Sequence, residues 1–178
     1  MIRGKVIWLT GMSGAGKTAI ACGSNLILGK MGISVHQIDG DDVRKRYGRK
    51  LGFSRADILH NNQTVVHLAD AARKKSDLVL VTVVGPLYAG RLLAREAFAS
   101  SFAEVYVSAK LTTLQKRDTK GLYSQAACGE IDDLIGVGNG VAYEPPSDPE
   151  LLIDTDLDGV HDSVEKFVKF VNDFRNKE

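Results

Sequence analysis

The sequence predicts an α/β fold in which a central parallel sheet of five strands is flanked by helices. Short apolar runs rich in β-branched residues alternate with longer stretches whose apolar residues recur at helical spacing. This alternation is typical of a parallel sheet that is covered by helices on both faces. We expect the strands at Lys5–Thr10, Ile33–Asp39, Leu78–Val84, Glu104–Ser108 and Leu151–Asp154.

The rest of the chain supplies helices and one long irregular segment. A helix should follow the first strand and run to about Lys30. The clearest helix is the last, where one apolar stripe repeats at three- and four-residue steps through Val160, Val164, Phe167, Val168, Val171 and Phe174. Thr119–Pro149 lacks periodicity and is rich in glycine and proline. Because such a long segment inside a domain is usually functional or disordered, we interpret residues 119–143 as a mobile lid.

Composition restricts the class of protein and of partner. With 178 residues, the chain has the size of a single domain, which we place at residues 1–178. The formal net charge of +1 offers no broad positive surface, so we expect neither a nucleic acid nor a membrane as partner. No apolar run approaches the ~18 residues of a membrane span. Cys22 and Cys128 form no metal or disulfide pattern, which favours reduced thiols and a cytoplasmic protein.

Residues 11–18 read GMSGAGKT and match the phosphate-binding pattern G-x-x-x-x-G-K-[ST] between a predicted strand and a predicted helix. Glycines allow successive backbone N–H groups to point at phosphate oxygens, and the helix N-terminus adds partial positive charge. The lysine should reach the β and γ phosphates of ATP, and the threonine hydroxyl should bind Mg²⁺. We assign ATP binding to Gly11, Ser13, Gly14, Ala15, Gly16, Lys17 and Thr18.

Carboxylates follow the second predicted strand. Asp39 and Asp41 lie at the carboxyl edge of the sheet, where open α/β folds bind ligands. Asp39 can bind Mg²⁺ together with Thr18, or accept the proton of an attacking hydroxyl, so Lys17 and Asp39 are the candidate catalytic residues. Arg44 can reach an anionic acceptor. Capping of a helix N-terminus is the alternative role for Asp41.

Over nearly its whole length the chain resembles the adenylylsulfate kinases, which phosphorylate the 3′-hydroxyl of adenosine 5′-phosphosulfate (APS) to give PAPS. The most specific matches are LGFS at residues 51–54 and KGLY at 120–123, in order with the phosphate loop. The resemblance implies a P-loop kinase, a homodimer and a nucleotide acceptor. It implies that Arg117 lies over the adenine of ATP and that the acceptor contacts Asp41, Arg44, Phe53, Asn61, Gly85, Pro86, Lys120 and Leu122.

The sequence departs from the family on the acceptor side. Arginines are usual in the family at the positions of Ile58, Gln63, Thr64 and Tyr88, and the serine that some members phosphorylate is Gly85 here. The segment 134–140 also replaces a family Phe-Thr-Gly-Ile motif. Charges that could compensate are Lys45, Arg46, Arg49 and Lys50, which can equally form a solvated helix end.

These departures leave three functional hypotheses. The first is APS phosphorylation by attack of the acceptor hydroxyl on the γ phosphorus, under a lid that excludes water. The second is the same chemistry on another nucleotide acceptor, for example a cytidine diphosphate derivative such as cytidine diphosphoramidate in capsule biosynthesis. The third is an ATP-binding regulatory protein without turnover, against which Lys17 and Asp39 argue. A GTPase is disfavoured because the chain has no Asn-Lys-x-Asp segment.

Residues 154–165 match the spacing of an EF-hand calcium loop. An EF-hand requires a helix on both sides of the loop, whereas Leu151–Asp154 is predicted to be a strand. We therefore interpret these carboxylates as a polar strand end followed by an acidic helix start.

Overall fold

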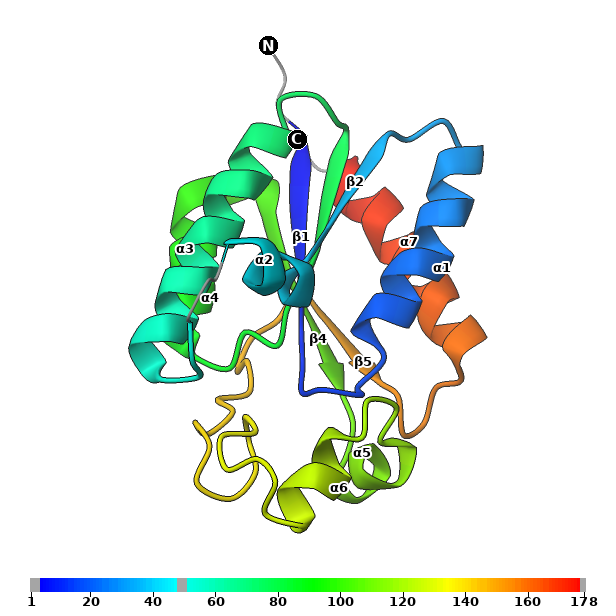
Figure 1. Ribbon diagram of the computed structural model, residues 1–178. Helices are drawn as coiled ribbons and strands as arrows, with labels where there is room; N and C mark the ends of the chain where they lie inside the picture. The colour runs from blue at the N-terminus through cyan, green and yellow to red at the C-terminus, as the bar shows by residue number, and fades with distance from the viewer. Residues whose placement is uncertain (1–3, 48–50, 177–178) are drawn as a thin grey trace.

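The computed structural model describes residues 4–47 and 51–176, and its centre is one sheet of five parallel strands (Figure 1). The strand order is β2-β3-β1-β4-β5, so the first strand lies in the middle. The carboxyl ends of all strands therefore share one edge. The strands are β1 (Lys5–Thr10), β2 (Val35–Asp39), β3 (Leu78–Thr82), β4 (Phe102–Ser108) and β5 (Leu151–Asp154).

Helices cover both faces of the sheet. In Figure 1, α1 and α7 lie on one side, and α3 and α4 lie on the other. Two short helices, α5 and α6, lie beyond the carboxyl edge of the strands. The helices are α1 (Lys17–Lys30), α2 (Gly40–Tyr47), α3 (Arg55–Ala72), α4 (Tyr88–Phe98), α5 (Leu111–Arg117), α6 (Leu122–Ala127) and α7 (Val160–Arg175), with a 3₁₀ turn at Ala99–Ser101.

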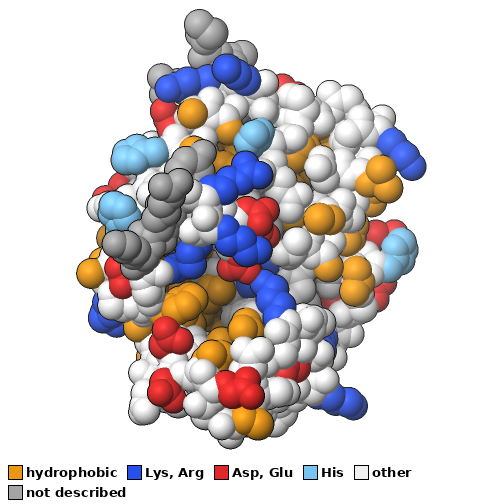
Figure 2. Space-filling view, viewed as in Figure 1, with side chains coloured by type: hydrophobic (Ala, Val, Ile, Leu, Met, Phe, Trp, Pro, Cys, Tyr) orange, Lys and Arg blue, Asp and Glu red, His pale blue; other side chains and the backbone are white. Residues whose placement is uncertain are grey.

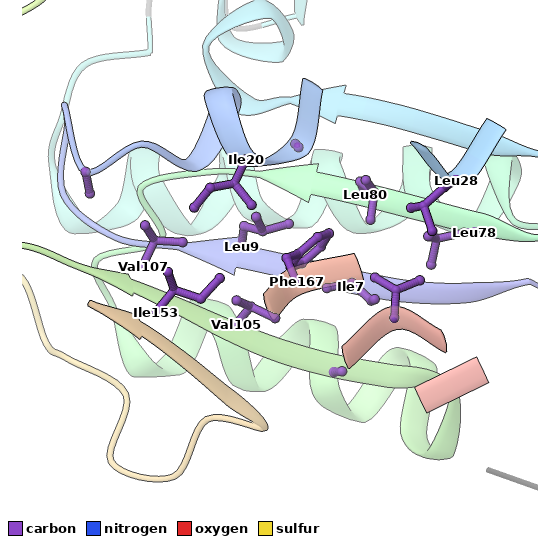
Figure 3. Packing of buried hydrophobic residues seen from close by; sticks show 14 of the residues in the cluster. Ile7, Leu9, Ile20, Leu28, Leu78, Leu80, Val105, Val107, Ile153 and Phe167 are labelled. Carbon is purple, nitrogen blue, oxygen red and sulfur yellow. The ribbon is translucent and has the colours of Figure 1, made fainter. Parts of the chain in front are cut away.

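Alternation along β1 builds two hydrophobic clusters. Ile7 and Leu9 are fully buried on the face covered by α1 and α7, where they join Phe167 (Figure 3). Val6 and Trp8 are fully buried on the other face. Successive side chains of a strand point to opposite faces, so a strand buried on both faces is apolar at every position. This burial fixes β1, and with it the start of the loop that follows.

The predicted fold class and all five predicted strands are confirmed, with differences at some strand ends. β2 begins at Val35 instead of Ile33, because Ser34 donates its N–H and hydroxyl to Asp77 Oδ2 at 2.8 and 2.7 Å. β3 ends at Thr82, two residues before the predicted end, although the Val83 N–H still donates to the Leu9 carbonyl at 3.1 Å and the Val84 carbonyl accepts from the Gly11 N–H at 3.3 Å. β4 begins at Phe102, two residues before the predicted start.

The predicted helices after β1 and at the C-terminus are also present. The stripe of α7 is buried at Val164, Phe167, Val171 and Phe174, but Val160 is exposed because it is the first residue of the helix. The expectation that Thr119–Pro149 lacks secondary structure is wrong in one part, since α6 lies within it. Among the residues that the structure describes, no helix is long and apolar enough to cross a membrane.

Candidate functional site

The phosphate-loop motif lies between β1 and α1, as its spacing predicts. Gly11, Gly14 and Gly16 have φ values of 150°, 79° and 102°, which L side chains rarely adopt. Gly11 also has no room for a side chain, because an added Cβ would lie 2.2 Å from the carbonyl oxygen of Val107. Ala15 is fully buried and packs in the core beneath the loop. The loop is therefore held at the carboxyl edge by the sheet and the core.

Lys17 folds back over this loop. Its side chain is only 8% exposed, and Nζ donates to the carbonyl oxygens of Gly11 and Met12 at 2.7 and 2.8 Å. Burial lowers the pKa of Lys17 from 10.5 to about 8, although Asp41 and Asp39 act in the opposite direction. A polyphosphate in the loop would replace these carbonyl contacts by stronger contacts to charged oxygens.

Asp39 ends β2 and is oriented by three hydrogen bonds. Its Oδ2 accepts from the hydroxyls of Thr18 at 3.2 Å and Thr82 at 3.0 Å. Its Oδ1 accepts from the N–H of Asp41 at 2.9 Å. One carboxylate beside two hydroxyls is an oxygen set that fits Mg²⁺, which takes few protein ligands and completes its shell with water and phosphate oxygens.

Asp41 faces the lid side of the cleft. Its carboxylate forms an ion pair with the ammonium of Lys120, which lies 79 positions further along the chain. Burial alone would raise the pKa of Asp41, but Lys120, Lys17 and Lys45 hold it below its usual range. Both side chains of the ion pair remain more than half exposed. A ligand that enters the cleft can therefore contact either side chain of this ion pair and change how the two side chains pair.

Arg44 and Phe53 form the opposite wall. The Arg44 guanidinium lies 4.5 Å from the centroid of the Phe53 ring and donates to the carbonyl of Gly52 at 2.6 Å. Phe53 is 38% exposed, so it is not a core aromatic residue. An exposed ring with a cation on one face leaves its other face open for a flat group such as a base.

These elements enclose a cavity of about 830 Å³, with a smaller cavity of about 40 Å³ beside it. Figure 2 shows a hollow with hydrophobic side chains inside it and charged side chains around its rim. Most of the predicted residues line the large cavity: Ser13, Gly14, Gly16, Lys17, Thr18, Asp39, Asp41, Arg44, Phe53, Lys120 and Leu122. Asn61, Gly85 and Pro86 line the small one.

Two buried donors, one lining the small cavity and one behind Gly85, are not predicted by the sequence. Asn62 is 3% exposed and lines the cavity, and its Nδ2 has no hydrogen-bond partner among residues 4–47 and 51–176. Trp8 Nε1 is likewise unpartnered within the described chain, and it lies 3.5 Å from where a Cβ of residue 85 would stand. A buried donor without a partner is costly, so an ordered water beside either group would be stabilising.

Arg117 is the last residue of α5 and does not line either cavity. Its guanidinium donates to the Thr155 hydroxyl at 2.9 Å and to the Thr155 carbonyl at 2.5 Å. Thr155 in turn donates to the carbonyl of Ala15 at 3.2 Å. Arg117 is thus tied to the back of the phosphate loop through Thr155, with its planar group held in one orientation.

The segment predicted to be a lid has several contacts with the phosphate loop and the small cavity. At its end, the Tyr143 hydroxyl lies 3.0 Å from Oγ1 of Thr10, the last residue of β1, and just beyond the segment the Glu144 N–H donates to the Pro86 carbonyl at 2.8 Å. Gly136 lies against Met12 of the phosphate loop, since an added Cβ would be 2.6 Å from Met12 Cε. Its middle part lines the cavities through Leu134 and Ile135.

The carboxylates of residues 154–165 have local partners. Asp154 ends β5, so the segment before it is a strand, as predicted. Asp156 Oδ2 accepts from the N–H of Lys110 at 2.9 Å, and Asp158 pairs with Lys166 at 2.6 Å. Among the described residues, no group of three or more His, Cys, Asp or Glu side chains is arranged to hold a metal ion.

Comparison with known proteins agrees with this geometry. A sequence model of the family described as adenylylsulphate kinase matches residues 3–154. The chain belongs to the adenylylsulphate kinase family. It is 36% identical over 171 residues to an adenylyl-sulfate kinase of Halothermothrix orenii, covering 96% of this chain and 91% of the relative. It is 42% identical over 151 residues to a probable adenylyl-sulfate kinase of Archaeoglobus fulgidus, covering 85% and 96%.

A solved structure of the family is similar over the same length. The Mycobacterium tuberculosis APS kinase CysC, in complex with AMPPNP and APS, superposes with a TM-score of 0.89 at 34% identity. The match covers 97% of this chain and 99% of that one. The resemblance drawn from LGFS, KGLY and the phosphate loop is therefore confirmed at the level of family and fold.

The positions that depart from the family pattern have different environments. Ile58 is buried and lines the small cavity. Gln63 is exposed, Thr64 is half-buried, and Tyr88 is 59% exposed. Lys45 lines the large cavity and pairs with Asp42 at 3.9 Å, and Arg46 is exposed. Arg49 and Lys50 lie outside the described residues.

Proposed function

We propose that this adenylylsulphate kinase family member transfers the γ-phosphoryl group of ATP to the 3′-hydroxyl of APS. The observation that carries the proposal is one cavity shared by the two sets of residues. The residues assigned to ATP and Mg²⁺, namely Lys17, Thr18 and Asp39, line this cavity. The acceptor residues Asp41, Phe53 and Lys120 line the same cavity. This arrangement allows a phosphate donor and an acceptor to meet at Asp39.

Each residue has a role that follows from its position. The backbone N–H groups of residues 11–18 and the Lys17 ammonium bind the phosphates and stabilise the charge that develops during transfer. Thr18 and Asp39 would hold Mg²⁺, which would neutralise negative charge on the phosphates when bound. Asp39 accepts the proton of the acceptor hydroxyl as the new O–P bond forms and ADP leaves.

The remaining predicted site residues complete the two subsites. Arg117 stacks over the adenine of ATP, using the guanidinium that Thr155 holds in place. Phe53 stacks on the acceptor base, and Asn61, Gly85 and Pro86 contact it from the small cavity. Leu122 and Lys120 close the cavity from the lid segment over residues 119–143, which excludes water during transfer.

A coupled ADP-release assay with purified protein, Mg²⁺, ATP and APS tests the proposal. We expect turnover with APS, and we expect its loss in Lys17→Ala with an unchanged circular dichroism spectrum. The readout should include the 3′-phosphorylated product by mass spectrometry, because ATP hydrolysis alone also releases ADP. Near-normal transfer by Lys17→Ala would contradict the role of the phosphate loop.

One observation favours a second candidate, transfer to a different nucleotide acceptor such as a cytidine diphosphate derivative. Ile58 places an apolar side chain in the small cavity where the family pattern has an arginine. A charge-assisted contact is worth about 1.5–3 kcal/mol, so its absence would weaken binding of a sulfate-bearing nucleotide. The same assay with a panel of nucleotide acceptors separates the two candidates by kcat/KM.

The proposal extends to organisation and location. We propose that residues 1–178 form one domain and that the protein acts in the cytoplasm. We also propose that it is a homodimer, as the family resemblance implies. Cys22 and Cys128 are exposed and unpaired, a state that reducing compartments maintain. Light scattering on a size-exclusion column would test the dimer, and a monomer at micromolar concentration would contradict it. Fractionation of cells would test the location.

A further inference from the structure

The first turn of α6 contacts the phosphate loop through Tyr123. This side chain is 6% exposed, and its hydroxyl donates to the carbonyl oxygen of Ser13 at 2.7 Å. Its ring lies against the next residue of the loop, since a Cβ added to Gly14 would stand 4.0 Å from Tyr123 Cε2. Burial, and secondarily the charge of Asp118, raises the pKa of Tyr123 to about 12, so the hydroxyl remains a donor at neutral pH.

The acceptor of this hydrogen bond belongs to a peptide group of the phosphate loop. The Ser13 carbonyl and the Gly14 N–H are parts of one planar trans peptide, so they point in opposite directions. With the carbonyl held by Tyr123, the N–H is directed to the other side of the loop. Ser13 and Gly14 both line the large cavity. Tyr123 therefore determines the orientation of one N–H group of the nest that receives the phosphates.

Tyr123 is itself held by its own turn. Asp118 Oδ1 accepts from the Tyr123 N–H at 3.0 Å, and Asp118 Oδ2 accepts from the Ser124 N–H at 2.9 Å and its hydroxyl at 2.6 Å. Lys120, on the same turn, pairs with Asp41 across the cavity. One turn thus reaches both the ATP side and the acceptor side of the site.

We propose that Tyr123 is a positioning residue for ATP, because its hydroxyl orients the Ser13–Gly14 peptide of the phosphate loop. The inference rests on the proposed ATP-dependent function. It assigns to the lid segment a role in preparing the phosphate loop before the acceptor binds. Removing the hydroxyl leaves the ring, and hence the packing on Gly14, in place.

The test compares Tyr123→Phe with Tyr106→Phe. Tyr106 is a half-buried tyrosine of β4 that stacks on Tyr143 with 6.1 Å between ring centroids, and its hydroxyl has no hydrogen-bond partner in the described part of the chain. Binding of AMPPNP with Mg²⁺ is measured by calorimetry without acceptor, and KM is then measured separately for ATP and for APS. Thermal melting of each variant monitors the fold.

We expect Tyr123→Phe to weaken AMPPNP binding and raise KM for ATP about two- to tenfold, the effect of one hydrogen bond. KM for APS at saturating ATP should stay within twofold of the wild type, and Tyr106→Phe should change neither constant. Unchanged AMPPNP affinity, or an equal rise in both KM values, would overturn the inference. Failure of the wild type to bind AMPPNP would instead contradict the proposed function.

Discussion

At the scale of single residues, the buried ammonium of Lys17 makes a pH-dependent prediction. Because its pKa is about 8 in the free protein, much of Lys17 is neutral above that pH. Bound phosphates favour the charged form and raise this pKa, so nucleotide binding above pH 8 must take up protons. Affinity for ATP should therefore fall as the pH rises through 8 and beyond.

Calorimetry of AMPPNP binding at pH 8.5, in buffers of different ionisation enthalpy, measures this proton uptake. Lys17→Arg is the matched control, since its guanidinium stays charged throughout this range. The wild type should take up more protons on binding than this variant. Equal uptake by the two proteins would show that the Lys17 pKa does not change on binding.

Asp39 supports a second prediction at this scale. Asp39→Asn keeps an oxygen that can accept from Thr18 or Thr82, but it removes the negative charge and the proton acceptor. We expect kcat to fall by at least about 10²-fold, the usual contribution of a general base, while AMPPNP binding in the absence of Mg²⁺ changes little. Rapid-quench measurement of a single turnover checks the chemical step, and an unchanged rate would remove Asp39 from the mechanism.

Local pattern and topology together indicated much of the candidate site. The phosphate loop could be predicted because its glycines, lysine and threonine are contiguous, and Asp39 because it ends a strand. Thr82 and Asn62 could not be predicted as site residues, since nothing in their local sequence distinguishes them, and the KGLY match at residues 120–123 assigns Tyr123 no contact with the phosphate loop. Their roles depend on contacts with residues 43 positions away for Thr82 and 110 for Tyr123.

At the scale of elements, α4 is joined to β4 by a buried ion pair. Arg91 Nε lies 2.6 Å from Glu104 Oε1, with both side chains less than 10% exposed. Arg91 also donates to the carbonyl of Gly85 at 2.8 Å. Removing one partner of a buried pair costs up to about 3–5 kcal/mol, and without Arg91 the Glu104 carboxylate would keep only the longer contact with Arg95, at 3.6 Å.

We therefore expect Arg91→Met to lower the free energy of unfolding in urea by about this amount. Arg95→Met is the comparison, because Arg95 is more exposed and lies 3.6 Å from the second oxygen of Glu104. Arg95→Met should lower the free energy of unfolding by a clearly smaller amount than Arg91→Met. A similar decrease in the free energy of unfolding for the two variants would mean that the buried Arg91–Glu104 pair stabilises the fold no more than the exposed contact does.

Element positions were predictable where burial decides them. β1 and β5 have the predicted bounds because their hydrophobic patterns stop at polar or glycine residues. The start of β2 depends on the hydrogen bonds from Ser34 to Asp77, 43 positions away, which no local pattern shows. Helix α6 cannot be predicted from apolar spacing, because it has only six residues and its first turn is held by Asp118, which accepts from the Tyr123 N–H.

At the scale of the whole molecule, the lid segment and the phosphate loop line the same large cavity. Leu134 and Ile135 are only half-buried where they line the cavity, so the free segment should open easily. We expect thermolysin, which cuts before large apolar residues, to cleave within residues 131–137 of the free protein. AMPPNP together with acceptor should slow this cleavage at least about tenfold, since closure buries the segment.

Mass spectrometry of the fragments locates the cut, and Lys17→Ala gives the control in which ligands should no longer protect. Cleavage at the same rate with and without ligands would mean that the segment does not close. This outcome would leave the chemistry of Asp39 unaffected.

The sequence predicts that the two subsites lie at the carboxyl edge of the sheet, but it does not predict which side chains meet there. Parallel strands place their carboxyl ends together, which brings Asp39 to the phosphate loop. The pairing of Lys120 with Asp41 depends on how α5 and α6 lie over the sheet, which no local pattern shows. The acceptor could not be predicted in detail for the same reason, because the environment of Ile58 depends on packing between distant elements.

The buried indole of Trp8 beside Gly85 provides an intrinsic fluorescence probe at one known position. Trp8 is the single tryptophan of the chain, so all indole emission comes from one fully buried position next to the small cavity. An acceptor base that stacks on Phe53 and borders this cavity should change the emission intensity or wavelength. Stopped-flow fluorescence could then follow acceptor binding in unlabelled protein and measure its rate before any phosphoryl group has moved.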